Sequence, residues 1–189
     1  MTPRTQGSDF EAREERIVDA VRDIAEEEGW SAVTVRRLAD EIGFSQPILY
    51  KHFPRGREEM VERVVVDGFT RLLAELKVAA SAAPDSRLRP VIVAYLRFAR
   101  QNPAVYAAMS TALTSIEFAT DETPRVLRDG FEVLRLSVGD GPDSVVRAEL
   151  LWAMLHGVGE LARHGRLDPE LEEARIDAMV GLFGPARSR

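Results

Sequence analysis

The sequence predicts an all-α protein: a small N-terminal helix-turn-helix module, a connecting helix and a larger helical domain. Nearly every long segment repeats its apolar residues at spacings of three and four, which is the period of a helix. No run of alternating β-branched residues is long enough to predict a strand. The length, 189 residues, suits one domain or a small module joined to a larger one.

The N-terminal module is expected over residues 10–56 and contains three helices. An apolar stripe from Ile17 to Ile24 predicts the first helix, which ends at Gly29. Thr34 can cap the second helix, which ends at Gly43. A short third helix is expected over 46–52.

A connecting helix is expected over 57–83 and a C-terminal domain over 84–184. Asn102-Pro103 breaks the helical pattern of this domain, and Pro124 suits the start of a helix. The helices expected in the domain cover about 88–101, 104–113, 124–138, 144–164 and 169–183.

Composition limits the chemistry. Hydrophobic residues make up 45% of the chain and charged residues 30%, which excludes global disorder. There is no cysteine, which excludes disulfides, thiolate zinc sites and cysteine nucleophiles. The three histidines, His52, His156 and His164, lack the spacing of a helical metal clamp, so we expect no metal and no resident cofactor.

The two ends and the apolar stretches indicate a compartment. Residues 1–9 are polar and lack the apolar core of a signal peptide, so we expect a cytoplasmic protein with a flexible N-terminal arm. The longest apolar stretch, Val91 to Leu96, is far shorter than the roughly 20 residues that span a bilayer, so no membrane partner is expected. Residues 185–189 are predicted to be a frayed tail.

The strongest functional signal is the segment 34–53, in which two short helices join through a tight turn that contains glycine. Ala39 is small where the helices touch, and Gly43 permits the positive φ that ends the first of them. Ser45 can cap the second helix, and Pro47 suits its first turn. The residues expected to fill the space between the helices are Leu38, Ile42, Phe44 and Leu49.

The second helix of this motif is left with side chains that suit a reader of the major groove. Gln46 can pair with adenine and Ile48 can touch a thymine methyl group. Tyr50, Lys51 and His52 can hold phosphates. The alternative is an ordinary helical hairpin whose charges are only solvated.

Charge is distributed as DNA binding requires. The whole chain has a net charge of −6, which excludes a broad nucleic-acid coat but permits a local basic patch. Residues 34–57 carry five basic and two acidic side chains, whereas residues 9–28 carry three basic and nine acidic ones. Contact with phosphates through the basic segment would depend strongly on salt.

These residues resemble the tetracycline-repressor-like (TetR) family of transcriptional regulators over about residues 12–70. The most specific part is Ile48-Leu49-Tyr50-Lys51-His52-Phe53-Pro54, similar to the signature that closes the family's recognition helix. Ile17, Ala20, Gly29, Val33-Thr34-Val35, Leu38-Ala39 and Ile42-Gly43 also carry the resemblance. Trp152-x3-His156-Gly157 resembles the Trp-His-Gly element of one class of C-terminal domain in this family.

The resemblance implies a homodimer whose recognition helices enter successive major grooves of double-stranded DNA. Family members usually start the connecting helix with Lys, but Pro54-Arg55-Gly56-Arg57 is one residue longer here, so Arg57 is expected to take that phosphate contact. The DNA-contacting residues expected on this basis are Thr34, Arg36, Gln46, Pro47, Ile48, Tyr50, Lys51, His52 and Arg57.

The expected helix over 144–164 has two apolar stripes, which indicates that it packs on its own domain and on something else. The resemblance places a four-helix dimer bundle here, and a thick monomeric core is the alternative. The residues expected at the dimer interface are Trp152, Leu155, Gly159, Met179 and Phe183.

Ligand pockets are mostly apolar with a few polar groups, and aromatic side chains recur on the helices of the second domain. For each of these side chains, plain core packing is the alternative. The residues expected to line an effector pocket are Tyr95, Phe98, Tyr106, Met109, Phe131, Trp152 and His156, with Phe118 as a further candidate.

The sequence therefore favours a regulator, most simply a repressor, that binds a palindromic operator as a homodimer and is released by a small apolar effector. An enzyme is the second hypothesis, but no paired carboxylates, activated nucleophile or phosphate-binding loop stands out. A helical adaptor that binds only protein is the third, and it would show no salt-sensitive affinity for DNA.

Overall fold

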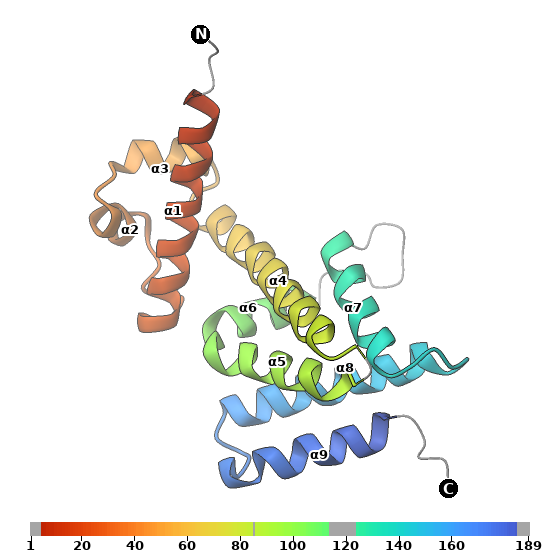
Figure 1. Ribbon diagram of the computed structural model, residues 1–189. Coiled ribbons are helices and arrows are strands. Elements are labelled where there is room, and N and C mark those ends of the chain that lie inside the picture. Colours follow the sequence, from red (N-terminus) through yellow and green to blue (C-terminus); the bar gives the residue numbers. More distant parts are fainter. Residues whose placement is uncertain (1–4, 85, 114–123, 185–189) are drawn as a thin grey trace, which may run out of the picture. The chain divides into compact units, whose positions relative to one another are not determined.

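The computed structural model describes residues 5–84, 86–113 and 124–184, and within these ranges all regular structure is helical, as predicted (Figure 1). None of these helices is both long and apolar enough to cross a membrane. The elements are α1 Thr5–Glu28, α2 Val35–Ile42, α3 Gln46–His52, α4 Arg57–Ala82, α5 Leu88–Gln101, α6 Pro103–Leu113, α7 Arg125–Ser137, α8 Ser144–Arg163, the 3-10 helix η1 Pro169–Leu171 and α9 Glu172–Phe183.

The chain forms two compact units. Unit 1 comprises Met1–Gly68 and Ala104–Leu113, and unit 2 comprises Phe69–Pro103 and Thr114–Arg189. This differs from the expected boundaries, because most of α6 belongs to the N-terminal unit. Helix α1 also begins at Thr5, within the expected arm 1–9. Residues 1–4, the predicted tail 185–189 and Phe118 lie outside the described residues.

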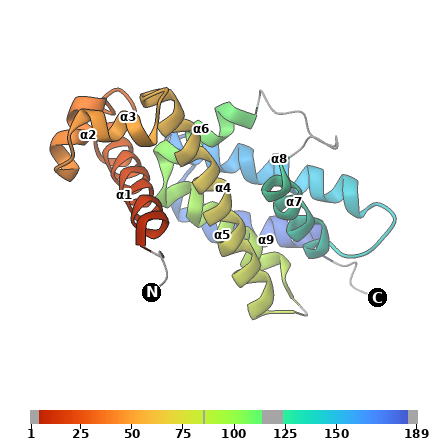
Figure 2. The same cartoon turned by 90° about the horizontal axis from the view of Figure 1, so that it is seen from above.

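Unit 1 is built on α1, which packs against α2, and α2 packs in turn against α3 (Figure 2). The Thr34 hydroxyl oxygen accepts a hydrogen bond from the Arg37 N–H at 3.1 Å, so Thr34 caps α2 as predicted. Gly43 ends α2 with φ 68°, in the left-handed region. The side chains buried from solvent here include Ile17, Val18, Val21, Ile24, Ala25, Val33, Leu38, Ala39, Leu49, Phe53, Met60, Val64 and Val65.

A tight turn connects α3 to α4. The Gly56 N–H donates to the Phe53 carbonyl oxygen at 2.8 Å, and the Arg55 N–H donates to a Glu59 carboxylate oxygen at 2.9 Å. Gly56 has φ 62°, and a Cβ added to it would lie 3.2 Å from Cε1 of Tyr50. Residues 54–56 therefore lie in this turn and α4 begins at Arg57. Gly56 also lies close to the Tyr50 ring.

Helix α6 is attached to unit 1 through its first turn. The Glu26 carboxylate of α1 accepts hydrogen bonds from the N–H groups of Ala104, at 2.8 Å, and Val105, at 3.0 Å. Trp30 Nε1 donates to the Ala104 carbonyl oxygen at 2.9 Å. A carboxylate is well suited to this place, because the first N–H groups of a helix lack partners within it.

In unit 2, α5 packs against α7, α8 and α9, and α8 packs against both α7 and α9 (Figures 1 and 2). The inward side of α8 repeats at spacings of three and four, with Ala148, Leu151 and Leu155 fully buried. The buried residues of α9 are Ile176, Met179 and Phe183. At the surface, Arg89 pairs with Glu173 and Asp177, and Arg100 pairs with Glu172, so α5 is tied to α9 by exposed ion pairs.

We predict that Gly43→Ala lowers the free energy of unfolding by about 1–2 kcal/mol, because alanine at this φ is strained. Gly130→Ala is the matched control. Gly130 lies inside α7 with open space around it, so the added methyl group should stabilise the protein by about 0.5–1 kcal/mol. Urea unfolding of both variants measures the difference, and a loss of stability no larger for Gly43→Ala than for Gly130→Ala would contradict the role of the turn.

Candidate nucleic-acid interface

Helix α3 presents one side to solvent and buries the other. Gln46, Pro47 and Lys51 are exposed, as are Ile48 (36%) and Tyr50 (48%). Leu49, between them in the sequence, is fully buried, as predicted for a core residue of the motif. The five exposed side chains thus lie on the surface of α3, available to a partner.

His52 does not belong to this exposed set, which corrects its expected role as a DNA contact. Its side chain is only 6% exposed, and its ring packs on Phe10 of α1 with a centroid distance of 4.0 Å. The reason is helical spacing: His52 follows Leu49 by three residues, so both side chains point to the same inward side.

Burial lowers the pKa of the His52 imidazole below its ordinary value of 6.5. Among nearby charges, the Glu14 carboxylate raises this pKa, and the cations Arg13 and Lys51 lower it further. Nδ1 of His52 is buried and has no hydrogen-bond partner in the described structure. His52 is therefore a neutral packing residue at pH 7.

Ser45 was expected to cap α3 through its side chain, and the structure shows that this prediction is wrong. The Ser45 hydroxyl makes no capping hydrogen bond, although its backbone carbonyl accepts from the Ile48 N–H at 3.0 Å. Ser45 is exposed next to Gln46. Its free hydroxyl makes it a candidate DNA contact that sequence reasoning assigned to another role.

On α2, Thr34 and Arg36 are both exposed. Thr34 uses only an oxygen lone pair for capping, so its hydroxyl proton can still be donated outward. Arg37 is instead held by Glu28, at 2.8 Å, and by Glu41 in the next turn of α2. These hydrogen-bonded carboxylates raise the pKa of the Arg37 guanidinium.

The arginines after α3 are also engaged within the protein. Arg57 Nε donates to the Val33 carbonyl oxygen at 2.9 Å, and its Nη2 donates to the Trp30 carbonyl oxygen at 2.8 Å. This geometry gives Arg57 a structural role in clamping the loop between α1 and α2, besides the expected phosphate contact. Arg55 pairs with Glu62, and this hydrogen-bonded ion pair lowers the pKa of the Glu62 carboxyl.

Arg36 and Lys51 are consequently the basic side chains of this segment that remain available. Neither forms an ion pair with a carboxylate in the part of the chain that the structure describes. Of five basic residues counted in the sequence, three are therefore occupied by internal partners.

The residues expected to line an effector pocket fall into both units. Tyr106 and Met109 lie on α6 in unit 1, whereas Tyr95, Phe98 and the remaining three lie in unit 2. Tyr95 and Phe98 are buried, and Phe131, Trp152 and His156 are partly exposed. Their grouping into one pocket stays a prediction.

Most of the residues expected at a dimer interface are buried within unit 2. Leu155 is fully buried, Gly159, Met179 and Phe183 are also in the core, and Trp152 is partly exposed. Their helical faces pack inside the chain, and a different set of apolar side chains is exposed beside them. On α8 this set is Val146, Leu150, Ala153 and Leu161, and on α9 it is Ala174, Ala178 and Leu182, preceded by Leu171 of η1.

Two family models match the chain. Residues 17–64 match bacterial regulatory proteins of the tetR family, and residues 88–183 match the tetracyclin repressor-like C-terminal domain. The nucleoid occlusion factor SlmA of Vibrio vulnificus is 33% identical over 111 residues, which are 55% of this chain and 54% of that protein. The match thus spans about half the length of this relative. The uncharacterized HTH-type transcriptional regulator Rv0681 of Mycobacterium tuberculosis is 28% identical over 172 residues, covering 88% of this chain and 77% of that protein.

Solved structures show the same fold. A protein with unknown function from Rhodococcus sp. RHA1 superposes with a TM-score of 0.70 at 25% identity, covering 98% of this chain and 100% of that chain. The TetR family transcriptional regulator PfmR from Thermus thermophilus superposes with a TM-score of 0.64 at 22% identity, covering 88% of this chain and 97% of that chain. The described architecture, a helix-turn-helix unit and a second helical unit, is therefore shared with known regulators.

The buried His52 predicts a pH dependence of stability. Its pKa is lowered in the folded protein, so below pH 6.5 the unfolded chain takes up a proton that the folded chain does not. This contribution to stability is present above pH 6.5 and is lost as the pH falls below it. His52→Phe keeps a ring against Phe10 and should reduce the loss of stability between about pH 7.5 and 5.5.

Urea unfolding at the two pH values measures this change. Val78→Gln is the control, because Val78 is 71% exposed and neither side chain carries an ionisable group, so the pH dependence should stay as it is in the original protein. An equal loss of stability in the original chain and in His52→Phe would contradict the burial argument.

Proposed function

Because the chain belongs to the tetR family of bacterial regulatory proteins, we propose that it represses transcription as a homodimer bound to a palindromic operator and is released by a small effector. The observation that carries the DNA-binding part is the exposed side of α3. Gln46, Ile48 and Tyr50 stand outward on a short helix whose Leu49 and His52 are anchored in unit 1.

Base contacts are assigned to the first turn of α3. Gln46 offers an amide that can pair with both N6 and N7 of adenine in the major groove. Ile48 and Pro47 present apolar surface that suits a thymine methyl group, and the free hydroxyl of Ser45 adds a donor and acceptor beside them.

Phosphate contacts are assigned to side chains that flank this turn. Arg36 and Lys51 provide the available positive charge, and Thr34 and Tyr50 provide hydroxyl donors. Contacts of this kind fix the register of the protein on the duplex without reading its sequence. Because each subunit offers only two available cations, we expect its affinity for DNA to depend modestly on the salt concentration.

The dimer interface is assigned to the exposed apolar stripes of α8 and α9. Leu150, Ala153 and Leu161 follow one side of α8, as Ala174, Ala178 and Leu182 follow one side of α9. A pair of such helices in each subunit supports a four-helix contact between two copies. A symmetric dimer would then bind two half-sites about 34–36 Å apart.

Effector control requires that a ligand in unit 2 favours one arrangement of the DNA-binding units over another. The bonds that Glu26 and Trp30 make to Ala104 and Val105 offer a connection, since Ala104 directly follows Pro103, which belongs to unit 2. We assign the transmission of the signal to this junction and to α4, which is continuous from Arg57 to Ala82.

We predict that Gln46→Ala weakens binding to the operator by about 1–3 kcal/mol, the value of one good base contact. Lys51→Ala should instead make the affinity less sensitive to salt. In a plot of log affinity against log salt concentration, the negative slope should become shallower by about 0.9 for each phosphate that the protein no longer neutralises. Fluorescence anisotropy with a duplex taken from the region upstream of the protein's own coding sequence measures both effects over a series of salt concentrations.

Arg128→Ala is the control for charge, because Arg128 is exposed on α7 in unit 2. This variant should change neither the affinity for the operator nor the dependence of that affinity on salt. An unchanged affinity in the double variant Tyr50→Ala, Lys51→Ala would count decisively against α3 as the reader and in favour of the adaptor hypothesis.

We further predict that the double variant Leu150→Glu, Leu182→Glu is monomeric. Each change places an unpaired carboxylate in the proposed contact, and two such charges should weaken dimerisation by on the order of 100-fold or more. Val78→Glu is the matched control, since Val78 is 71% exposed on α4. Analytical ultracentrifugation distinguishes the species, and a dimer that persists in the double variant would exclude this interface.

A further inference from the structure

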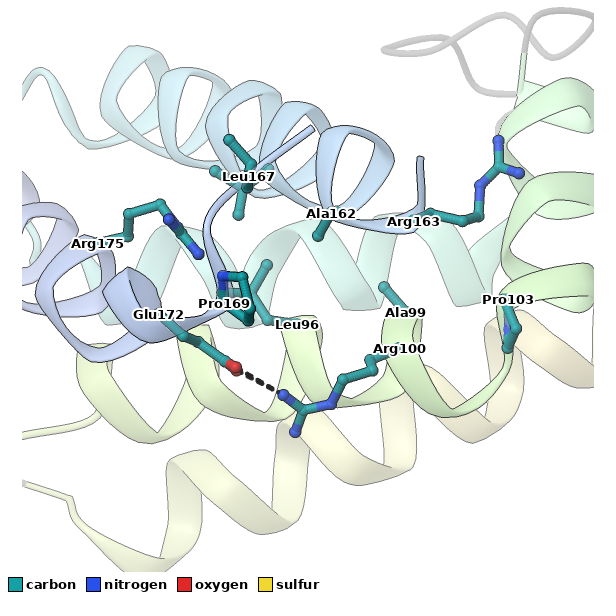
Figure 3. A pocket seen from close by; sticks show the side chains of 12 residues that line it. Leu96, Ala99, Arg100, Pro103, Ala162, Arg163, Leu167, Pro169, Glu172 and Arg175 are labelled. Carbon is teal, nitrogen blue, oxygen red and sulfur yellow. Dashed lines mark hydrogen bonds and ion pairs between the residues drawn. The ribbon is translucent and has the colours of Figure 1, made fainter. Parts of the chain in front are cut away.

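Unit 2 contains a cavity of about 330 Å³ between the C-terminal end of α5, the C-terminal end of α8 and the start of α9 (Figure 3). Leu96 and Ala99 of α5, Val158 of α8 and Leu167 form much of its wall. The volume lies near the lower end of the range of roughly 300–1,000 Å³ that is typical of small-molecule pockets. The cavity therefore suits a small ligand that is largely apolar.

The charged side chains of the lining are three arginines and one glutamate, so the lining has an excess of positive charge. Arg100 is satisfied, because its Nη1 lies 2.7 and 2.8 Å from the two carboxylate oxygens of Glu172. Arg163 is also satisfied, because its Nη2 lies 2.8 Å from a carboxylate oxygen of Glu160. Both of these cations thus have a carboxylate partner inside the chain.

Arg175 differs from the other two. Its Nη2 donates to the Asp168 carbonyl oxygen at 2.8 Å, which is a neutral acceptor. Among the described residues no carboxylate lies within ion-pair distance of it. Figure 3 shows its side chain reaching from α9 toward the segment that carries Leu167 and Pro169. Since a guanidinium has five N–H donors, Arg175 keeps donors for a further anionic partner.

We propose that this cavity binds a small amphiphilic carboxylate, a molecule with a short apolar chain and one carboxylate group. The chain lies against Leu96, Ala99 and Val158, and the carboxylate pairs with Arg175, whose planar fork matches a carboxylate in geometry. The excess of positive charge in the lining disfavours a cationic ligand. That this carboxylate acts as the effector of a regulator rests on the proposed function. That it binds in the cavity does not.

The cavity borders the surface proposed for dimerisation but is lined by different residues. On α8, Ala162 lies on a different side of the helix from Leu150 and Ala153, whereas Val158 precedes Leu161 of the proposed contact by three residues and lies next to it on the helix surface. Pro103 also lines the cavity, and the next residue, Ala104, is bonded to Glu26 and Trp30. A ligand in this cavity would therefore contact Pro103, the residue immediately before the segment Ala104–Leu113 that belongs to unit 1.

Isothermal titration calorimetry of the full chain with octanoate, in the absence of DNA, tests this proposal. 1-Octanol is the neutral ligand with the same chain. Arg175→Gln removes the charge, and Ala162→Phe fills the cavity from an exposed position, so that neither variant disturbs the core. Arg128→Gln, an exposed arginine outside the cavity, is the matched control.

We expect saturable binding of octanoate that Arg175→Gln and Ala162→Phe each weaken about tenfold or more, with no effect of Arg128→Gln. Octanol should bind more weakly than octanoate and should be indifferent to Arg175→Gln. Absence of octanoate binding, equal affinity for octanol, or unchanged affinity in both cavity variants would overturn the proposal. Because no DNA is present, these outcomes are independent of whether α3 binds an operator.

Discussion

The proposed DNA-binding surface depends on the anchoring of one side of α3. Leu49 is fully buried, and the His52 ring packs on Phe10 of α1. In a helix of seven residues, two inward side chains three positions apart fix its rotation about its own axis. The outward directions of Gln46, Ile48 and Tyr50 follow from that rotation. A burial contact is thus what determines which side chains can meet a base edge.

The sequence predicted the helices well because each is marked by local signals. Gly43 ends α2, Thr34 caps it and the apolar spacing identifies the buried residues, and all three depend only on neighbours in the chain. The assignment of α6 failed for the opposite reason. Its attachment to unit 1 depends on Glu26 and Trp30, which lie 74 to 79 residues away from their partners. No periodicity in the sequence reveals such a contact.

The candidate site shows the same distinction. The motif predicts that Gln46 and Tyr50 are exposed, and they are, whereas the expectation that His52 faces outward is wrong because His52 follows the buried Leu49 by three residues. Three of the five basic residues of segment 34–57 also have partners inside the protein. Arg37 is taken up by Glu28 and Glu41, Arg55 by Glu62, and Arg57 by two backbone carbonyls. A count of charge in the sequence therefore overstates the charge that a surface offers to DNA.

The arginines whose donors are held inside the protein stabilise the fold, and those that keep free donors and lack a carboxylate partner are available to bind an anion. An arginine whose donors are aligned on backbone carbonyls, as in Arg57, holds a loop in place and loses that function if it turns to a phosphate. An arginine with a single neutral acceptor, as in Arg175, can accept an anion without breaking an ion pair. Arg36, Lys51 and Arg175 can therefore each bind an anionic partner without breaking an ion pair among the described residues. Two of them lie in the helix-turn-helix unit and one in the other unit, so DNA and a small anion would bind through different side chains and need not compete directly.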